Sequence, residues 1–337
     1  MMDQESMGLP RMTSADTARR GFMQLGSLRL NLYASRVAYL ETFGSLFRQH
    51  PTRQAPRAAA EVDAEVYLVS RAADSPDFLV GPMPADGSVA RWERVGEGYQ
   101  ELFTGRFRVV LVRRAAPWRI VLVVREPQHS PRAFRDHLFE VVTKALFALD
   151  RVYLHAAALR HQERVDLFVG QGSFGKTTIS LRLAQAGATL LSEDHVLFNR
   201  TERGIVLSGC QETVRLTPKT ERWAFGDALA NEPVSPLDGK KEIAAERFFH
   251  SAPYEEFPFQ RIFFNHVGET LLLEPISSRD AVLRLFTMTR SFRSDAAADV
   301  ERYLDYLTQV VEGRELYDLE LSPDLGRLDD LVRLLRG

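Results

Sequence analysis

The sequence predicts an α/β fold in which an N-terminal α+β domain precedes a C-terminal domain built around a phosphate-binding loop, or P-loop. Three observations favour this fold. A glycine-rich motif at 170–177 lies between an apolar strand-like run and a segment with helical periodicity. Apolar and polar residues alternate over much of 62–125, which is typical of a mostly antiparallel sheet. Helical periodicity dominates 277–335 and predicts C-terminal helices.

The domain organisation follows from changes in composition along the chain. Residues 1–25 are polar with mixed charge, and we expect them to be flexible. Residues 26–130 contain helix-like and strand-like segments and form the predicted α+β domain, which we interpret as a scaffold or a substrate-recognition surface. Residues 131–337 then form the predicted P-loop domain with its C-terminal helices.

Composition excludes several classes of function. The chain has 337 residues, is 45% hydrophobic and carries a net charge of −2, so neither a nucleic acid nor an anionic membrane is an expected partner. Cys210 is the only cysteine, which rules out a disulfide within the chain and a cysteine-rich metal site. The first residues contain no apolar segment typical of a signal peptide, and we expect a cytoplasmic location.

The glycine-rich motif fits the pattern G-x-x-x-x-G-K-[ST] through Gly170, Gly175, Lys176 and Thr177. Glycines let the backbone approach a phosphate group, and the N–H groups at the start of the following helix then point at its oxygens. In such a loop the lysine reaches the β and γ phosphates and the hydroxyl residue binds Mg²⁺. The expected nucleotide-binding residues are Gly170, Gln171, Gly172, Ser173, Phe174, Gly175, Lys176, Thr177 and Thr178. The alternative is a glycine-rich turn without a ligand.

Two acids follow the next short strand. Glu193 and Asp194 end the segment that begins at Thr189, and Asp194 comes only eighteen positions after Lys176. The helix after the loop must therefore return directly to the strand that bears the acids. This places Asp194 near the γ-phosphate, as a Mg²⁺ ligand or as a base for an incoming hydroxyl. In isolation the same residues also suit a solvated turn.

A histidine interrupts the apolar run 152–159, which we predict to be one buried strand. His155 is a polar ring in an environment where an unpaired polar group is unfavourable. On the strand alone, a core histidine with satisfied hydrogen bonds is the default interpretation.

Taken together, Leu154-His155, the loop GQGSFGKT and the tripeptide Ser-Glu-Asp at 192–194 resemble the catalytic domain of the HPr serine kinase/phosphorylase family. The resemblance is closer to its HPr-kinase-related proteins, some of which occur with lasso-peptide gene clusters, and it covers about residues 150–200. It implies a fold shared with phosphoenolpyruvate carboxykinases and a requirement for ATP and Mg²⁺. It also implies catalytic roles for His155, Lys176 and Asp194, and a serine-type hydroxyl of a protein or peptide as acceptor.

The sequence departs from the family in two places. Glu193 stands where the family usually has a first aspartate. The family signature Glu-Ile-Arg-Gly-Leu-Gly is matched only by Glu212-Thr-Val-Arg215-Leu. Glu212 is accordingly the candidate for a second Mg²⁺ ligand beside Thr177 and Asp194. We expect neither the reverse phosphorylase activity nor HPr itself as substrate.

Further candidates lie downstream of the acids. Segments 204–208 and 212–216 are predicted to be strands of the same sheet, and a long polar segment covers 217–258. Charged residues here and beside the loop are possible contacts to substrate or phosphate, or else ordinary solvent-exposed charges: Glu193, Arg215, Lys240 and Lys241.

Three functions remain open at this point. The first is a protein or peptide kinase, the second a kinase of the same fold that acts on a small-molecule hydroxyl, and the third a regulator that binds ATP and transfers nothing. Asp194 separates the two kinases from the regulator, because only a kinase needs this residue for phosphoryl transfer. Related enzymes form oligomers, so a homo-oligomer is a further expectation, although no segment specifies an interface.

Overall fold

The computed structural model describes most of the chain. The described residues are 20–34, 36–49, 55–58, 61–70, 91–93, 99–103, 107–112, 118–124, 131–172, 174–235, 239–289, 297–322, 324 and 327–336. The chain divides into two compact units. Unit 1 comprises residues 1–149 and 291–300, and unit 2 comprises residues 150–290 and 301–337.

Unit 1 contains a seven-stranded sheet in the order β1-β2-β3-β7-β6-β5-β4. Its strands are β1 (Arg20–Leu25), β2 (Leu28–Ala34), β3 (Ala64–Ser70), β4 (Arg91–Glu93), β5 (Tyr99–Phe103), β6 (Phe107–Val112) and β7 (Trp118–Val124). Four neighbouring pairs are antiparallel, whereas β2–β3 and β3–β7 are parallel. The structure therefore contains the mostly antiparallel sheet that the alternation predicts.

Two helices belong to unit 1, α1 (Val37–Leu46) and α2 (Pro131–Ala148). Leu40 and Phe43 of α1 are buried, as the helical spacing predicts. Arg20–Leu25 forms a strand, so this part of the segment expected to be flexible is regular, and residues 1–19 lie outside the described residues. Helix α2 groups with unit 1, while the boundary predicted at residue 130 stays a prediction.

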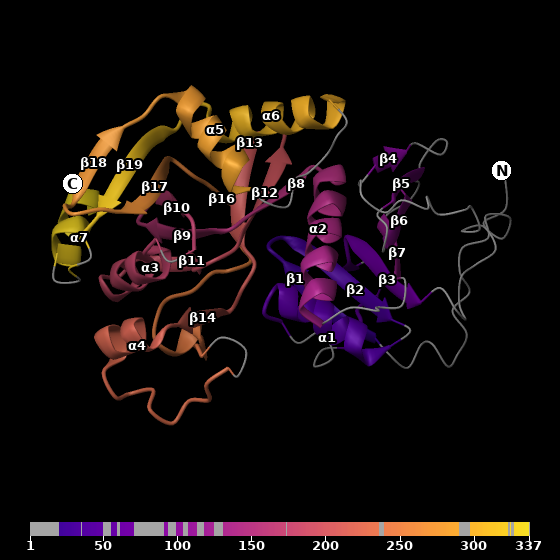
Figure 1. Ribbon diagram of the computed structural model, residues 1–337, viewed down its shortest axis with the longest axis horizontal. Helices are drawn as coiled ribbons and strands as arrows, with labels where there is room; N and C mark the ends of the chain where they lie inside the picture. Colours follow the sequence, from indigo (N-terminus) through magenta and orange to yellow (C-terminus); the bar gives the residue numbers. More distant parts are fainter. Residues whose placement is uncertain are drawn as a thin grey trace, which may run out of the picture. The chain divides into compact units, whose positions relative to one another are not determined.

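Unit 2 is organised around a mixed six-stranded sheet in the order β11-β9-β10-β17-β19-β18 (Figure 1). Its strands are β9 (Ala156–His161), β10 (Arg164–Val169), β11 (Thr189–Ser192), β17 (Arg261–Val267), β18 (Leu272–Pro275) and β19 (Glu315–Leu321). The central strands β10, β17 and β19 are parallel to one another. Their carboxyl ends meet at one edge of the sheet, which is where parallel sheets commonly bind ligands.

A second sheet in unit 2 has the order β16-β13-β12-β8. It consists of β8 (Arg151–Leu154), β12 (Val196–Thr201), β13 (Gly204–Gly209) and β16 (Phe257–Pro258). The segment after β13 leaves this sheet, and β14 (Thr213–Leu216) pairs instead with β15 (Lys241–Ala244). The prediction that 204–208 and 212–216 share one sheet is therefore wrong. The single strand predicted at 152–159 is wrong as well, because β8 and β9 belong to different sheets.

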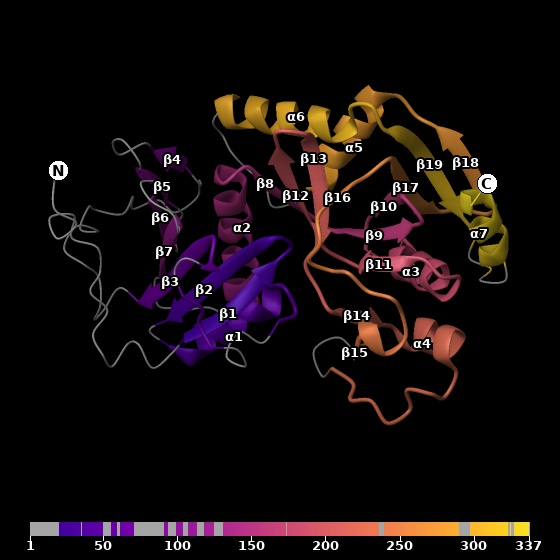
Figure 2. The same cartoon turned by 180° about the vertical axis from the view of Figure 1, so that it is seen from behind.

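Helices cover both faces of the six-stranded sheet. On one face α3 (Lys176–Gln185) and α7 (Leu328–Arg336) pack over Phe168 and Phe263 in a common apolar core. On the other face the Arg284 guanidinium of α5 (Ser278–Met288) lies over the Phe264 ring. Figures 1 and 2 show α5 beside α6 (Ala297–Val311), whereas α4 (Pro218–Phe225) lies near β14.

Side-chain caps fix the starts of two of these helices. The Ser277 hydroxyl accepts a hydrogen bond from the Asp280 N–H, as expected from a serine followed three residues later by an acid at the start of α5. Thr217 caps α4 in the same way, with Pro218 in the first turn. Helix α4 and strand β15 occupy part of the polar segment 217–258 for which the sequence predicted no regular structure.

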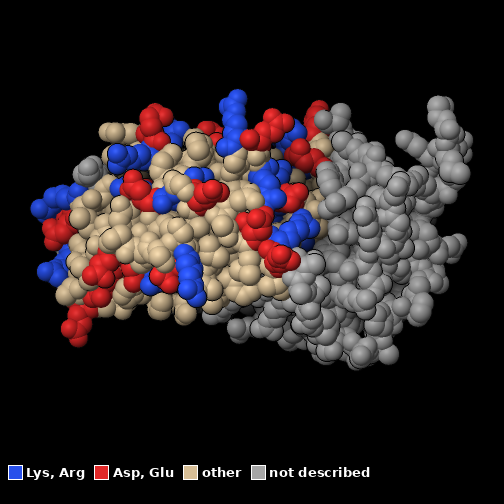
Figure 3. Space-filling model, turned by 90° about the horizontal axis from the view of Figure 1, so that it is seen from above, with Lys and Arg blue, Asp and Glu red and all other residues tan. Residues whose placement is uncertain are grey.

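The surface of unit 2 carries charges of both signs. On the face seen in Figure 3, Lys and Arg side chains are interspersed with Asp and Glu, with no area given over to one sign among the described residues. Among the helices of the described part of the chain, none is both long and apolar enough to cross a membrane.

Candidate active site

The glycine-rich loop, residues 170–175, connects β10 to α3 at the carboxyl edge of the parallel strands. Gly175 has a φ of 81°, in the left-handed region that glycine adopts without strain, and its carbonyl accepts the first hydrogen bond of α3, from Ile179. A Cβ atom at Gly170 would lie 2.8 Å from the Asn265 carbonyl oxygen of β17. Both glycines of the motif are therefore required by the local backbone. Ser173 lies outside the described residues.

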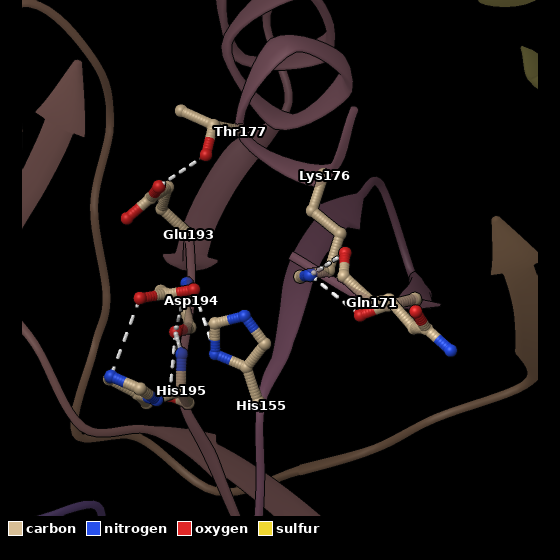
Figure 4. Close-up of polar contacts among 9 residues, drawn as sticks. His155, Gln171, Lys176, Thr177, Glu193, Asp194 and His195 are labelled. Carbon is tan, nitrogen blue, oxygen red and sulfur yellow. Dashed lines mark hydrogen bonds and ion pairs between the residues drawn. The ribbon is translucent and has the colours of Figure 1, made fainter. Parts of the chain in front are cut away.

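Lys176 is buried at the start of α3, and its ammonium group turns back over the loop (Figure 4). Nζ donates hydrogen bonds to the carbonyl oxygens of Gly170, at 2.7 Å, and Gln171, at 3.0 Å. Burial lowers the pKa of Lys176, an effect that Lys240 reinforces and the negative charges of Asp194 and Glu193 oppose. The loop thus holds a buried cation within electrostatic reach of both acids.

Two chain segments cross from one sheet of unit 2 to the other at the same place. His155 lies between β8 and β9, while Glu193, Asp194 and His195 lie between β11 and β12. Leu154 pairs with Val196 in the four-stranded sheet, and Ala158 pairs with Ser192 in the six-stranded sheet. The histidine and the acids are held opposite each other because both of their flanking strand pairs are fixed by backbone hydrogen bonds.

Asp194 lies between two imidazole rings at this crossing (Figure 4). Its Oδ1 is 2.9 Å from His155 Nδ1, and its Oδ2 is 3.4 Å from His195 Nε2. The Ser192 hydroxyl accepts hydrogen bonds from the backbone N–H groups of Asp194 and His195 and fixes the turn. His155 is therefore not simply a core residue, since its ring orients the carboxylate of Asp194.

Glu193 points to the start of α3. Its Oε1 accepts a hydrogen bond from the Thr177 hydroxyl at 2.5 Å, and the residue is 3% exposed. A buried carboxylate needs such a partner. Of the two acids, Glu193 is thus the one in contact with the hydroxyl expected to bind Mg²⁺, a pairing that sequence spacing did not reveal.

The site offers donors for two kinds of cation. The oxygen atoms of Thr177 and Glu193 suit Mg²⁺, which prefers hydroxyl, carboxylate and water ligands. The ligand atoms of His155, Asp194 and His195 all lie within 4.8 Å of one another, a nitrogen and oxygen set that also suits transition metals. The oxygen donors present therefore fit the Mg²⁺ that the sequence predicts.

The other predicted residues are placed in different surroundings. Glu212 is exposed and forms a hydrogen bond with Tyr254; the pKa of that phenol is raised by burial first and by the Glu212 charge second. The Lys241 ammonium donates to Glu221 Oε1 at 2.7 Å and to the Leu229 carbonyl at 2.6 Å. These contacts tie Lys241 to α4 and the residues after it.

Lys240 and Arg215 are half-buried. Lys240 is close enough to Lys176 to lower the pKa of that lysine, so it contributes positive charge to the loop. Arg215 lies on β14 opposite Glu242. The roles proposed for Arg215, Glu212 and both lysines stay predictions.

Comparison with known proteins adds little to this geometry. No protein-family model matches the sequence, and no curated protein matches it. Among solved structures, the chain is similar to the HPr(Ser) kinase/phosphatase from Coxiella burnetii. That similarity covers 55% of this chain and 93% of the other, with 10% sequence identity and a TM-score of 0.31. We base the functional conclusion on the side chains of the site.

Proposed function

We propose that the chain is an ATP- and Mg²⁺-dependent kinase with a P-loop, and that it transfers the γ-phosphoryl group to a serine-type hydroxyl of a protein or peptide. The observation that carries this proposal is the position of Asp194, oriented by His155 and within electrostatic reach of the loop lysine. A carboxylate held next to a phosphate site, with its direction set by a neighbouring ring, is suited to act as a base.

The proposed roles follow the contacts of each side chain. The loop N–H groups and Lys176 bind the phosphates, and Lys176 exchanges its hydrogen bonds to Gly170 and Gln171 for phosphate oxygens. Thr177 and Glu193 hold Mg²⁺, directly or through a water. Bound Mg²⁺ neutralises part of the phosphate charge.

In the transfer step, the acceptor hydroxyl oxygen attacks the γ-phosphorus and its proton passes to Asp194. The bond between the γ-phosphorus and the bridging oxygen breaks, and ADP leaves. His155 and His195 keep the carboxylate directed at the hydroxyl. The choice of a protein or peptide acceptor rests on the resemblance of residues 150–200 to the HPr-kinase-related proteins.

The test uses γ-labelled ATP, Mg²⁺ and an extract of the cells that make the protein. Asp194→Asn keeps the shape of the side chain and removes the base, so it should abolish labelling while nucleotide binding is retained. Asp305→Asn is the matched control, because that acid is exposed and its contacts, with Arg200 at 3.5 Å and with Gln309 at 2.9 Å, lie on the protein surface.

Label in macromolecules that disappears only with Asp194→Asn would support the proposal. Label confined to small molecules would favour a metabolite kinase. Binding of nucleotide without any transfer would favour a regulator, and full transfer by Asp194→Asn would overturn the assignment of the base.

A further inference from the structure

Asn265 is a buried carboxamide that the structure leaves without a hydrogen-bond partner. It lies on β17 and is 2% exposed, and neither Nδ2 nor Oδ1 has a partner among the described residues. Buried amides are almost always paired because an unsatisfied polar group is unfavourable inside a protein. A side chain in this state is therefore a candidate for a partner that arrives with a ligand.

The position of Asn265 places it under the glycine-rich loop. Strand β10 ends at Val169, which pairs with Phe264 of β17, so the next residues of the two segments, Gly170 and Asn265, are neighbours. A Cβ atom at Gly170 would lie 3.3 Å from the Asn265 Cβ and 2.8 Å from the backbone carbonyl oxygen of Asn265. This close approach brings the start of the loop directly onto Asn265.

Alternation along β17 indicates which face of the sheet the carboxamide occupies. Phe263, two residues earlier, stacks on Phe168 within the core under α3. Side chains two residues apart in a strand point to the same face, so the Asn265 side chain lies on the face that α3 covers. Its partner on β19 is Leu319, which belongs to the same core. The carboxamide therefore lies at the end of the core nearest the N-terminus of α3.

We propose that Asn265 recognises the terminal phosphoryl group of the bound nucleotide, its Nδ2 group donating a hydrogen bond to a γ-phosphate oxygen. This inference rests on the proposed function. A neutral carboxamide is suited to the task because it can stay buried while the loop is empty, whereas the charged Lys176 needs the Gly170 and Gln171 carbonyls in that state. Asn265 thus distinguishes a nucleoside triphosphate from a diphosphate.

The test replaces Asn265 by leucine, which has a similar shape and no polar atoms. Calorimetric titration with Mg²⁺ measures the affinities for ADP and for a non-hydrolysable ATP analogue. Losing one hydrogen bond to a charged group should weaken binding of the ATP analogue about tenfold or more, whereas ADP binding should change less than about twofold. The thermal midpoint of the nucleotide-free variant should not fall, because leucine removes an unpaired polar group.

The matched control is Asn199→Leu. Asn199 is also buried on a strand of unit 2, but its Nδ2 already donates to Glu256 Oε1 at 2.6 Å. This control should lower the thermal midpoint and leave the ratio of the two affinities unchanged.

The ratio of the two affinities decides the outcome. Selective loss of the ATP analogue in Asn265→Leu supports the inference. Equal losses for both nucleotides, or no loss, overturn it while leaving the proposed function intact. If the wild-type protein binds neither nucleotide, both the proposed function and this inference are overturned.

Discussion

The hydroxyl of Thr177, the first residue after the loop lysine, is hydrogen-bonded to the Glu193 carboxylate, while the neighbouring Asp194 is turned toward His155. The two consecutive acids therefore have different partners and different proposed tasks. In the proposed mechanism, Glu193 contributes to the Mg²⁺ site and Asp194 acts on the acceptor hydroxyl. Replacing each acid by its amide should give different kinetic defects.

Glu193→Gln should raise the Mg²⁺ concentration needed for half-maximal phosphoryl transfer by about tenfold, because an amide oxygen is a weaker Mg²⁺ ligand than a carboxylate. Maximal transfer at saturating Mg²⁺ should fall less. The measurement is a titration of transfer rate with Mg²⁺. Glu242→Gln serves as control, since Glu242 is an exposed residue of β15. An unchanged Mg²⁺ requirement in Glu193→Gln would remove Glu193 from the metal site.

Lys176→Met should abolish nucleotide binding and yet stabilise the nucleotide-free protein by about 1 kcal/mol, since it replaces a buried cation by an apolar side chain of similar length. Urea denaturation would measure the free energy of unfolding, and calorimetry the binding. A large loss of stability in the variant would contradict the prediction.

The difference in the free energy of unfolding between Lys176→Met and the wild type should depend on pH. The pKa of Lys176 is lowered in the folded protein from its usual value of 10.5, mainly by burial. The folded state consequently binds the Lys176 proton less tightly than the unfolded state does. The buried charge therefore destabilises the wild-type protein fully at pH values below the lowered pKa. This destabilisation disappears as pH rises from that value toward 10.5. The stability difference between Lys176→Met and the wild type should therefore shrink as pH is raised from 7 to 10.

A buried ion pair joins three elements near the amino ends of β10 and β17. Arg261 on β17 forms two hydrogen bonds with Asp166 on β10, both 2.7 Å, and one with the Leu335 carbonyl of α7. Asp166→Ala should lower the free energy of unfolding by about 3 to 5 kcal/mol, because it leaves the buried guanidinium unpaired.

The double variant Asp166→Leu/Arg261→Met should lose much less stability than Asp166→Ala, since it removes both charges. Urea denaturation of the two proteins provides the comparison. If the double variant is the less stable of the two, the pair contributes more than its replacement by apolar groups and the prediction is wrong.

Gly209 at the end of β13 passes so close to β11 that a Cβ atom there would lie 1.8 Å from the Leu191 carbonyl oxygen. Gly209→Ala should therefore destabilise the protein by about 3 kcal/mol, and it should also reduce phosphoryl transfer, because Leu191 leads into the turn that carries the acids. Gly187→Ala is the control. It meets no atom within 4 Å and has a φ of 96°, so only backbone strain of about 1 kcal/mol is expected.

Sequence patterns predicted the local elements of unit 2 better than their pairing. The strand before the loop and the helix after it follow from patterns within a few neighbouring residues. A glycine directly after a helical pattern also predicts a left-handed C-terminal cap, and Gly187 has the corresponding positive φ. The break at His155 was missed because the residues on both sides of this histidine are mostly apolar, so the segment suits one buried strand as well as two. The segment is divided because β8 pairs with β12 whereas β9 pairs with β11, and neighbouring residues in the sequence do not specify such long-range pairing.

The site shows the same division between local and long-range information. Lys176 and Thr177 are specified by a motif, and the pair Glu193 and Asp194 by its spacing from them. Which acid contacts Thr177 depends on how β11 enters the turn, and sequence spacing does not report this. Asn265 was missed entirely, because its place beneath Gly170 arises from the parallel pairing of two strands nearly a hundred residues apart.

The crossing at His155 and Asp194 also determines where the chain tolerates a change of length. Adding or deleting one residue in β8, β9, β11 or β12 near the crossing would rotate the following side chains to the opposite face and separate the two residues. At the far ends of β9 and β12, the two-residue turns Gln162–Glu163 and Glu202–Arg203 lead into β10 and β13, and the residues of both turns are exposed. Affinity tags or fluorescent labels inserted at these turns should leave the register of the crossing unaltered.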